Sequence, residues 1–176
     1  MRKVVLVSTL IVLLACGSSA DVLSPGGGTS GPPCTLTVSG ATAGSYACTT
    51  RSASSSDTTG LGYLMMGYGT AGQTVPVIGV TFTFADLPQE GTFTDADADG
   101  GTTARITVTA VADAWEANAG TSAPETGTYT LVLTRVTSVK VLAEGEIYAV
   151  NGTLDATLPP VPRTSATGNV TLHAAF

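Results

Sequence analysis

Six stretches of the chain alternate apolar and polar residues with a period of two. In each of them nearly every second side chain is apolar, and threonine dominates the positions between. The stretches are CTLTV (34–38), VTFTF (80–84), RITVTAV (105–111), TYTLVL (128–133), YAVNGTLDATL (148–158) and NVTLHAAF (169–176). This period is typical of β-strands that bury one face and expose the other. The chain is therefore predicted to be an all-β protein.

Short segments rich in Gly, Pro, Ser and Thr separate these strands, which favours an antiparallel β-sandwich of the immunoglobulin or jelly-roll kind. The stretch GYLMMGYG (62–69) is either a strand buried on both faces or an apolar rim for a partner, and we prefer the first interpretation. DAWEANA (113–119) has room for one helical turn. Residues 34–176 are long enough to form one domain with its own core.

The N-terminus has the features of an export signal. Arg2 and Lys3 precede the apolar run VVLVSTLIVLLA (4–15), which is too short for a membrane span of about 20 residues. The run ends directly at Cys16, and LLAC (13–16) resembles the lipobox of bacterial lipoproteins. That resemblance implies removal of residues 1–15 and a lipid on Cys16. A plain secretory signal that contains a cysteine is the alternative.

Residues 16–33 are predicted to join the lipid to the domain. The sequence GSSADVLSPGGGTSGPP (17–33) has no apolar period, so it is predicted to be a flexible linker. The lipoprotein resemblance implies three acyl chains on Cys16, and two or more chains hold a protein stably at a bilayer. Gly17 stands where some lipoproteins carry an aspartate that retains them in the inner membrane. The expected location is therefore the bacterial cell envelope, at the outer membrane.

The charge of the chain argues against nucleic acid as a partner. The full sequence has 7 basic and 13 acidic residues, and loss of Arg2 and Lys3 with the signal leaves 5 against 13, which changes the net charge from −6 to −8. Phosphate backbones and anionic lipid surfaces repel such a chain.

Cys34 and Cys48 are predicted to form a disulfide. An exported chain enters an oxidising compartment, and the two cysteines are 14 residues apart. A metal site is the poorer interpretation because His173, the single histidine, is far away in the sequence. The bridge would connect either the two strands of a hairpin across GATAG (40–44) or two facing sheets, and the spacing does not distinguish them.

An acidic stretch, DADADG (95–100), matches half of an EF-hand calcium loop. Asp95, Asp97 and Asp99 occupy ligand positions 1, 3 and 5, and the glycine follows at position 6. Position 12 requires a bidentate glutamate, but here it is Ile106, the first apolar residue of a predicted strand. The stretch is therefore not an EF-hand.

Two interpretations of the acidic stretch remain open. It could hold one calcium ion if Glu90 or a distant acid completes the ligand shell. The preferred interpretation is a solvated acidic turn between the strands at 80–84 and 105–111, because water and salt also relieve repulsion among carboxylates. No cofactor is expected under this interpretation.

The other candidate residues do not indicate catalysis. His173 falls on the solvated side of its strand, and no nucleophile elbow accompanies it, so the chain is not predicted to be an enzyme. Trp115, with Glu116 and Asn118 beside it, is a candidate anchor for a sugar. The favoured alternative is that Trp115 plugs the open end of the sandwich, since large aromatic residues usually lie in cores.

The order of these motifs resembles a family of small, uncharacterised bacterial lipoproteins of the myxobacterial type. The resemblance is carried by CTLTVSGATAGSYAC, VTFTF, Trp115, GTYTLVLTRV, NGTLDATL and TGNVTLHAAF. It implies a disulfide-containing β-sandwich in the cell envelope and transfers no catalytic or ligand-binding residue. We expect a non-catalytic lipoprotein with a structural or interaction role and an envelope protein or glycan as partner; the alternative is a calcium-assisted or carbohydrate-binding surface module.

Overall fold

The computed structural model describes residues 34–69, 78–96, 101–109, 113–120 and 126–176. The described residues form ten antiparallel strands of one sheet, in the order β5-β8-β9-β10-β1-β2-β3-β4-β6-β7. The strands are β1 (Thr35–Gly40), β2 (Gly44–Ser56), β3 (Leu61–Gly69), β4 (Ile78–Phe84), β5 (Gly91–Thr94), β6 (Thr103–Thr109), β7 (Ala114–Ala119), β8 (Thr128–Leu142), β9 (Gly145–Leu158) and β10 (Val170–Ala175). The predicted all-β fold is confirmed.

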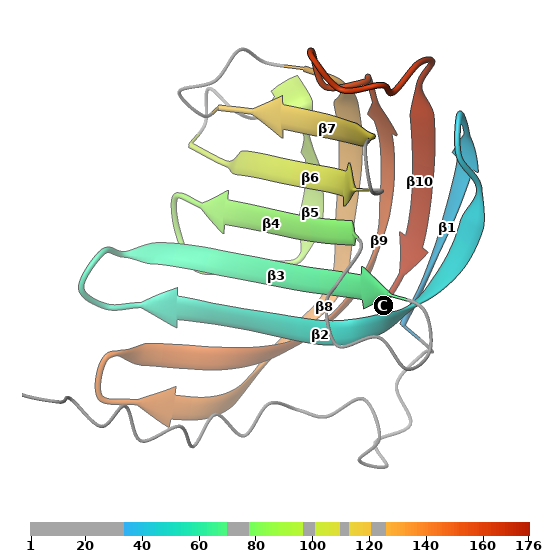
Figure 1. Cartoon of the computed structure of the whole chain (residues 1–176). Helices are drawn as coiled ribbons and strands as arrows, with labels where there is room; N and C mark the ends of the chain where they lie inside the picture. Colours follow the sequence, from blue (N-terminus) through green and yellow to red (C-terminus); the bar gives the residue numbers. More distant parts are fainter. Residues whose placement is uncertain (1–33, 70–77, 97–100, 110–112, 121–125) are drawn as a thin grey trace, which may run out of the picture.

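The sheet folds over on itself into two layers. Strands β2, β3, β4, β6 and β7 form one layer, and β5, β8, β9, β10 and β1 form the other (Figure 1). The strands of the two layers cross at a steep angle, as in orthogonal packing, where strands pass from one layer to the other at corners. The two layers of the predicted sandwich are thus parts of one continuous sheet.

Strand β2 forms the corner. Its first half pairs with β1, and its second half pairs with β9 through Ala53–Tyr148 and Ser54–Ile147. A β-bulge between Cys48 and Thr50 bends β2 at the point where it leaves β1. The extra β9–β2 pairing closes β9, β10, β1 and β2 into a ring.

The opposite side of the molecule is closed by irregular backbone pairing along β7. The Asn118 and Thr126 backbones exchange N–H···O bonds of 2.8 and 2.9 Å. The N–H of Glu116 donates to the Pro159 carbonyl at 3.1 Å, and that of Val161 donates to the Ala114 carbonyl at 2.8 Å. Since Thr126 precedes β8 and Pro159 follows β9, these bonds connect the last strand of one layer to the other layer. The sheet is therefore barrel-like.

The core lies between the layers and consists of the inward-facing residues of each strand. Phe82 of β4 meets Tyr129 of β8 edge-to-face with ring centroids 5.2 Å apart, and Phe84 meets Phe93 of β5 at 5.0 Å. Other fully buried side chains come from six strands and the C-terminal residue: Leu36, Leu64, Tyr68, Ile78, Ile106, Leu131, Leu154 and Phe176. Aromatic and aliphatic packing of this kind supplies most of the stability of a sheet fold.

The structure differs from the sequence-based interpretation in two segments, residues 114–119 and strand β3. Residues 114–119 form strand β7 and not a helical turn, because Trp115, Ala117 and Ala119 alternate toward the core. Strand β3 buries Leu64, Met66 and Tyr68 as preferred, but Met65 is 55% exposed, so β3 is not buried on both faces along its length. Within the described ranges, no helix has the length and apolarity needed to cross a membrane.

Candidate functional site

The predicted disulfide between Cys34 and Cys48 is present. It connects β1 and β2 across their hairpin, with the two Cα atoms 5.4 Å apart, within the usual range for disulfides. The Cys48 N–H also donates to the Cys34 carbonyl at 3.0 Å. The choice between a hairpin and two facing sheets is thereby decided in favour of the hairpin. Cys16, the predicted lipidation site, lies outside the described residues.

The acidic stretch connects β5 to β6 and so passes from one layer to the other. It does not directly follow the strand at 80–84, because β5 intervenes. Asp95, at its start, is half-buried, and its Oδ1 accepts a bond of 3.2 Å from the backbone N–H of Tyr129 in β8. Asp97 and Asp99 lie outside the described residues. The first aspartate of the motif therefore has a structural contact at the beginning of β8.

Glu90 is in the wrong place to assist Asp95. The two residues flank β5 at opposite ends, five residue steps apart, which corresponds to roughly 16 Å in an extended strand. The Glu90 Oε1 lies 3.4 Å from the backbone N of Val136 in β8. The suggestion that Glu90 completes a calcium shell around Asp95 is therefore corrected.

A distant acid does come close to Asp95. Asp95 and Asp155 of β9 line one shallow hollow of about 290 Å³ on the outer face of the layer that contains β8, β9 and β10, together with hydroxyls of Thr128, Thr130 and other threonines. Asp155 was not predicted to be a candidate. It occupies an outward position of β9, and only the β8–β9 register brings it opposite Thr130 and near β5.

His173 pairs with Asp155 at the edge of this hollow. The His173 Nδ1 and the Asp155 Oδ1 are 2.7 Å apart, and both side chains are more than three-fifths exposed. The predicted solvated position of His173 is confirmed. Because water screens an exposed pair, this contact orients the two side chains and contributes little to stability. Among the described residues, no group of three or more His, Cys, Asp or Glu side chains is arranged to hold a metal ion.

Trp115 is a core residue. Its side chain is 4% exposed, and the indole N–H donates to the Gly168 carbonyl at 3.0 Å. Trp115 therefore links β7 to the segment after β9 and helps to close the sheet, as in the favoured interpretation. The alternative, in which Trp115 forms an open platform for a sugar, is corrected because stacking requires an exposed ring face.

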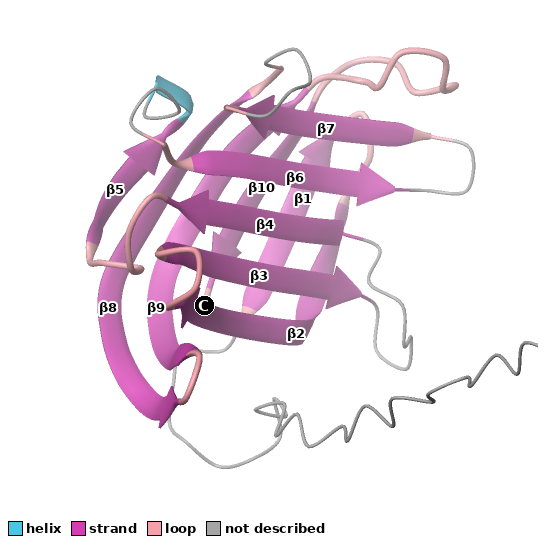
Figure 2. Ribbon diagram, turned by 90° about the vertical axis from the view of Figure 1, so that its left-hand side faces the viewer, coloured by secondary structure: helices cyan, strands magenta, loops and turns pink. Residues whose placement is uncertain are grey.

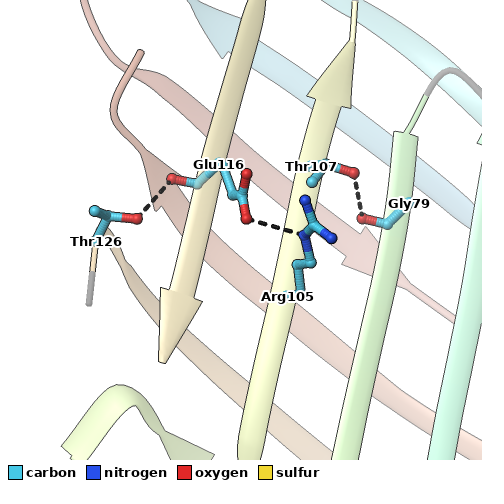
Figure 3. Close-up of polar contacts among 5 residues, drawn as sticks. All are labelled: Gly79, Arg105, Thr107, Glu116 and Thr126. Carbon is cyan, nitrogen blue, oxygen red and sulfur yellow. Dashed lines mark hydrogen bonds and ion pairs between the residues drawn. The ribbon is translucent and has the colours of Figure 1, made fainter. Parts of the chain in front are cut away.

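The outer face of β4, β6 and β7 carries a second groove, of about 460 Å³. Figure 3 shows the polar contacts of residues that line it. Arg105 of β6 and Glu116 of β7 form an ion pair on it, with Nε and Oε1 2.9 Å apart. The Thr107 hydroxyl donates to the Gly79 carbonyl at 3.4 Å, and the missing side chain of Gly79 deepens the floor. The paired charges compensate each other, so the groove suits a neutral polar ligand better than an ion.

Sequence reasoning named Glu116 only as a neighbour of Trp115 and did not identify Arg105. A signal for both residues exists: each occupies a polar position in a period-two segment, and such positions of adjacent antiparallel strands share a face. The order β4-β6-β7 was needed to bring them together.

Comparison of the chain with protein-family models, curated proteins and solved structures gives no match.

Proposed function

We propose that this protein is a non-catalytic lipoprotein of the bacterial cell envelope that acts through interaction with a partner. The observation that carries the proposal is the Cys34–Cys48 disulfide in a chain that has a signal-like N-terminus. Disulfides persist in oxidising compartments, so a bridge in the first hairpin supports export. The apolar run that ends at Cys16 supports lipid attachment at that residue, and residues 17–33 would then tether the domain to the outer membrane.

The anchor is tested by Cys16→Ser in the full chain. The wild-type protein is expected to partition into the detergent phase and to carry lipid mass on the peptide that begins at Cys16. The variant is expected to fractionate with soluble periplasmic protein, because the acyl chains supply the membrane affinity. Identical partitioning of the two chains, with no lipid on the wild type, would contradict the proposal. A Ser18→Ala variant is the matched control and should behave as the wild type.

A calcium-assisted binding module is the second candidate function. The observation that favours it is the shared hollow of Asp95 and Asp155, because carboxylate and hydroxyl oxygens are the ligands that calcium prefers. An ion there would offset the charge of two acids that line the same hollow of an acidic chain.

Thermal unfolding of the Cys16→Ser chain tests this second candidate. Calcium that binds the native state at 100 times its Kd raises the free energy of unfolding by about 2.7 kcal/mol. Each kcal/mol of added stability raises the Tm by about 2–4 °C. Asp155→Asn should abolish the shift, whereas Asp86→Asn, in a loop on the far side of β5, should not. An unchanged Tm at millimolar calcium would exclude calcium binding.

A further inference from the structure

The groove on the outer face of β4, β6 and β7 contains a glycine that the strand itself does not require. Gly79 lies inside β4, in unbroken register with β3 on one side and β6 on the other, so it marks no bulge. Among the described residues, a Cβ at Gly79 would meet only the Thr107 hydroxyl, at 3.2 Å. Glycine weakens a strand, and inside one it often marks a bulge, a bend or the close approach of a ligand. With no bulge and no crowding backbone, Gly79 favours the approach of a ligand.

A pair of opposite charges lies in the same groove as this glycine (Figure 3). The ion pair joins the Nε of Arg105 to the Oε1 of Glu116, and the two side chains are 65% and 21% exposed. The Nη groups of Arg105 and the Oε2 of Glu116 lie outside this contact and can meet a ligand. The Glu116 backbone is fixed by bonds to Pro159 and Thr126. The groove therefore presents N–H donors and a carboxylate acceptor side by side on paired strands.

The main chain of the groove floor is already paired, which disfavours a peptide as the ligand. Figure 2 shows β4, β6 and β7 side by side, with β10 and β1 behind them. Residues 104–108 of β6 pair with β4 on one side and with β7 on the other. A peptide that adds to a sheet needs unpaired N–H and C=O groups at an edge. The ligand must therefore bind through side chains, which are the ion pair and the hydroxyls of Thr81, Thr107 and Thr109.

A more apolar hollow of about 260 Å³ adjoins the groove on the far side of β7. Pro159, Pro160 and Pro162 contribute to its lining, and Glu116 and Val161 line both the hollow and the groove. The groove, at about 460 Å³, lies within the range of about 300–1,000 Å³ that is typical of ligand sites. A ligand longer than one small ring could therefore contact the ion pair and the prolines together.

We propose that the groove and the adjoining hollow bind a neutral oligosaccharide. Arg105 disfavours a cation and Glu116 an anion, so the pair selects a neutral molecule. Sugar hydroxyls both donate and accept hydrogen bonds, which matches the guanidinium, the carboxylate and the threonine hydroxyls. The C–H faces of sugar rings match the prolines. The inference rests on the proposed function and deepens it, because it names a ligand class for a protein that acts through a partner.

A glycan array with neutral and acidic oligosaccharides tests the ligand class. The Cys16→Ser chain should be retained by neutral glycans and not by acidic ones. Arg105→Met should lower the affinity for a retained glycan by about tenfold or more, because it removes charged hydrogen-bond donors. Thr37→Val, at an exposed position of β1 in the other layer, is the matched control and should bind as the parent does. Retention by acidic glycans alone, or by no glycan, would overturn the proposal.

Backbone amide chemical shifts of the same chain locate the retained glycan. Titration should move the amide signals of Gly79, Arg105 and Glu116. Movement confined to the hollow that Asp95 and Asp155 line would overturn the proposal, since the glycan would then bind the other layer.

Gly79→Val separates binding from folding. Valine would fill the groove floor, so the affinity for the glycan should fall by about tenfold or more, while the Tm stays the same or rises because valine favours strands. Undiminished binding by this variant would overturn the proposal. If its Tm falls, the fold needs the glycine, and Arg105→Met then decides: undiminished binding by Arg105→Met overturns the proposal. Lipid on Cys16 is measured in a different chain, so a failed glycan site and a failed anchor are separate results.

Discussion

Arg51 is the residue whose position is hardest to reconcile with its chemistry. It lies on β2 opposite Met66, which is buried, so its side chain is directed toward the core side of the sheet. Its Nη1 is buried and has no hydrogen-bond partner among the residues that the structure describes. Burial raises the pKa of the nearby Tyr68 hydroxyl well above its usual range, and the Arg51 charge only partly opposes that shift. Arg51 therefore directs a buried guanidinium nitrogen toward the core side of the sheet, where no described residue accepts a hydrogen bond from it.

Arg51→Met is expected to stabilise the protein. Methionine keeps the apolar stem and removes a buried donor whose lack of a partner costs about 1–3 kcal/mol. The midpoint of urea unfolding should rise by the corresponding amount. Arg105→Met is the matched control on the outer face. It should cost no more than about 1 kcal/mol, since Arg105 is largely exposed and its ion pair with Glu116 is screened. A lower midpoint for Arg51→Met would show that Arg51 has a partner in solution.

At the scale of the element, side-chain period predicted some strands and missed others. β1, β4, β6, β9 and β10 alternate apolar and polar residues and were found within a few residues of their ends. β2 was expected only as a strand around Cys48, and its length was missed, because SYACTTRSASSS (45–56) contains small and polar residues whose inward positions include Ala53 and Ser55. The second half of β8 was missed because it has no buried face, and its apolar and polar residues therefore do not alternate.

Two glycines inside strands differ in what they permit. In β9, a Cβ on Gly152 would collide with the carbonyl oxygen of Val132 and lie 3.1 Å from Cζ of Phe176. In β4, a Cβ on Gly79 would meet only the Thr107 hydroxyl, at 3.2 Å. The close approach of β8, β9 and the C-terminus at Gly152 thus depends on the absence of a side chain.

Gly152→Ala is therefore expected to destabilise the protein by about 1–3 kcal/mol, the usual cost of overpacking against groups that cannot move aside. Gly79→Ala should change the free energy of unfolding by no more than about 0.5 kcal/mol, since a single hydroxyl can rotate away. Denaturant unfolding of both variants at one temperature measures the difference. Equal midpoints would mean that the Val132 backbone shifts at little cost.

For the whole molecule, the Cys34–Cys48 bridge and the closed sheet act on different states. The bridge closes a loop of about 15 residues. In the chain-entropy description, it lowers the conformational entropy of the unfolded chain and so stabilises the folded state by about 3 kcal/mol. The β9–β2 pairing and the bonds along β7 act only in the folded state.

The double variant Cys34→Ala/Cys48→Ala should lose about 3 kcal/mol of unfolding free energy. The experiment uses the Cys16→Ser chain, so that no free thiol can exchange with the bridge. Reductant should lower the urea midpoint of the parent to that of the double variant and leave the double variant unchanged. If reductant breaks the bridge and the urea midpoint of the parent stays the same, the bridge contributes nothing to stability.

The sequence by itself determined the fold class, the disulfide partners and the solvated position of His173. These features depend on local period and on the number of cysteines, which require no knowledge of strand order. Only the tertiary structure decided that the layers are one sheet, that Trp115 lies inside, that Asp155 and Asp95 line the same hollow, and that Arg105 pairs with Glu116. Each of these depends on which strands become neighbours. Strand order results from the packing of the whole core, so it cannot be predicted from the alternation of residues within a single strand.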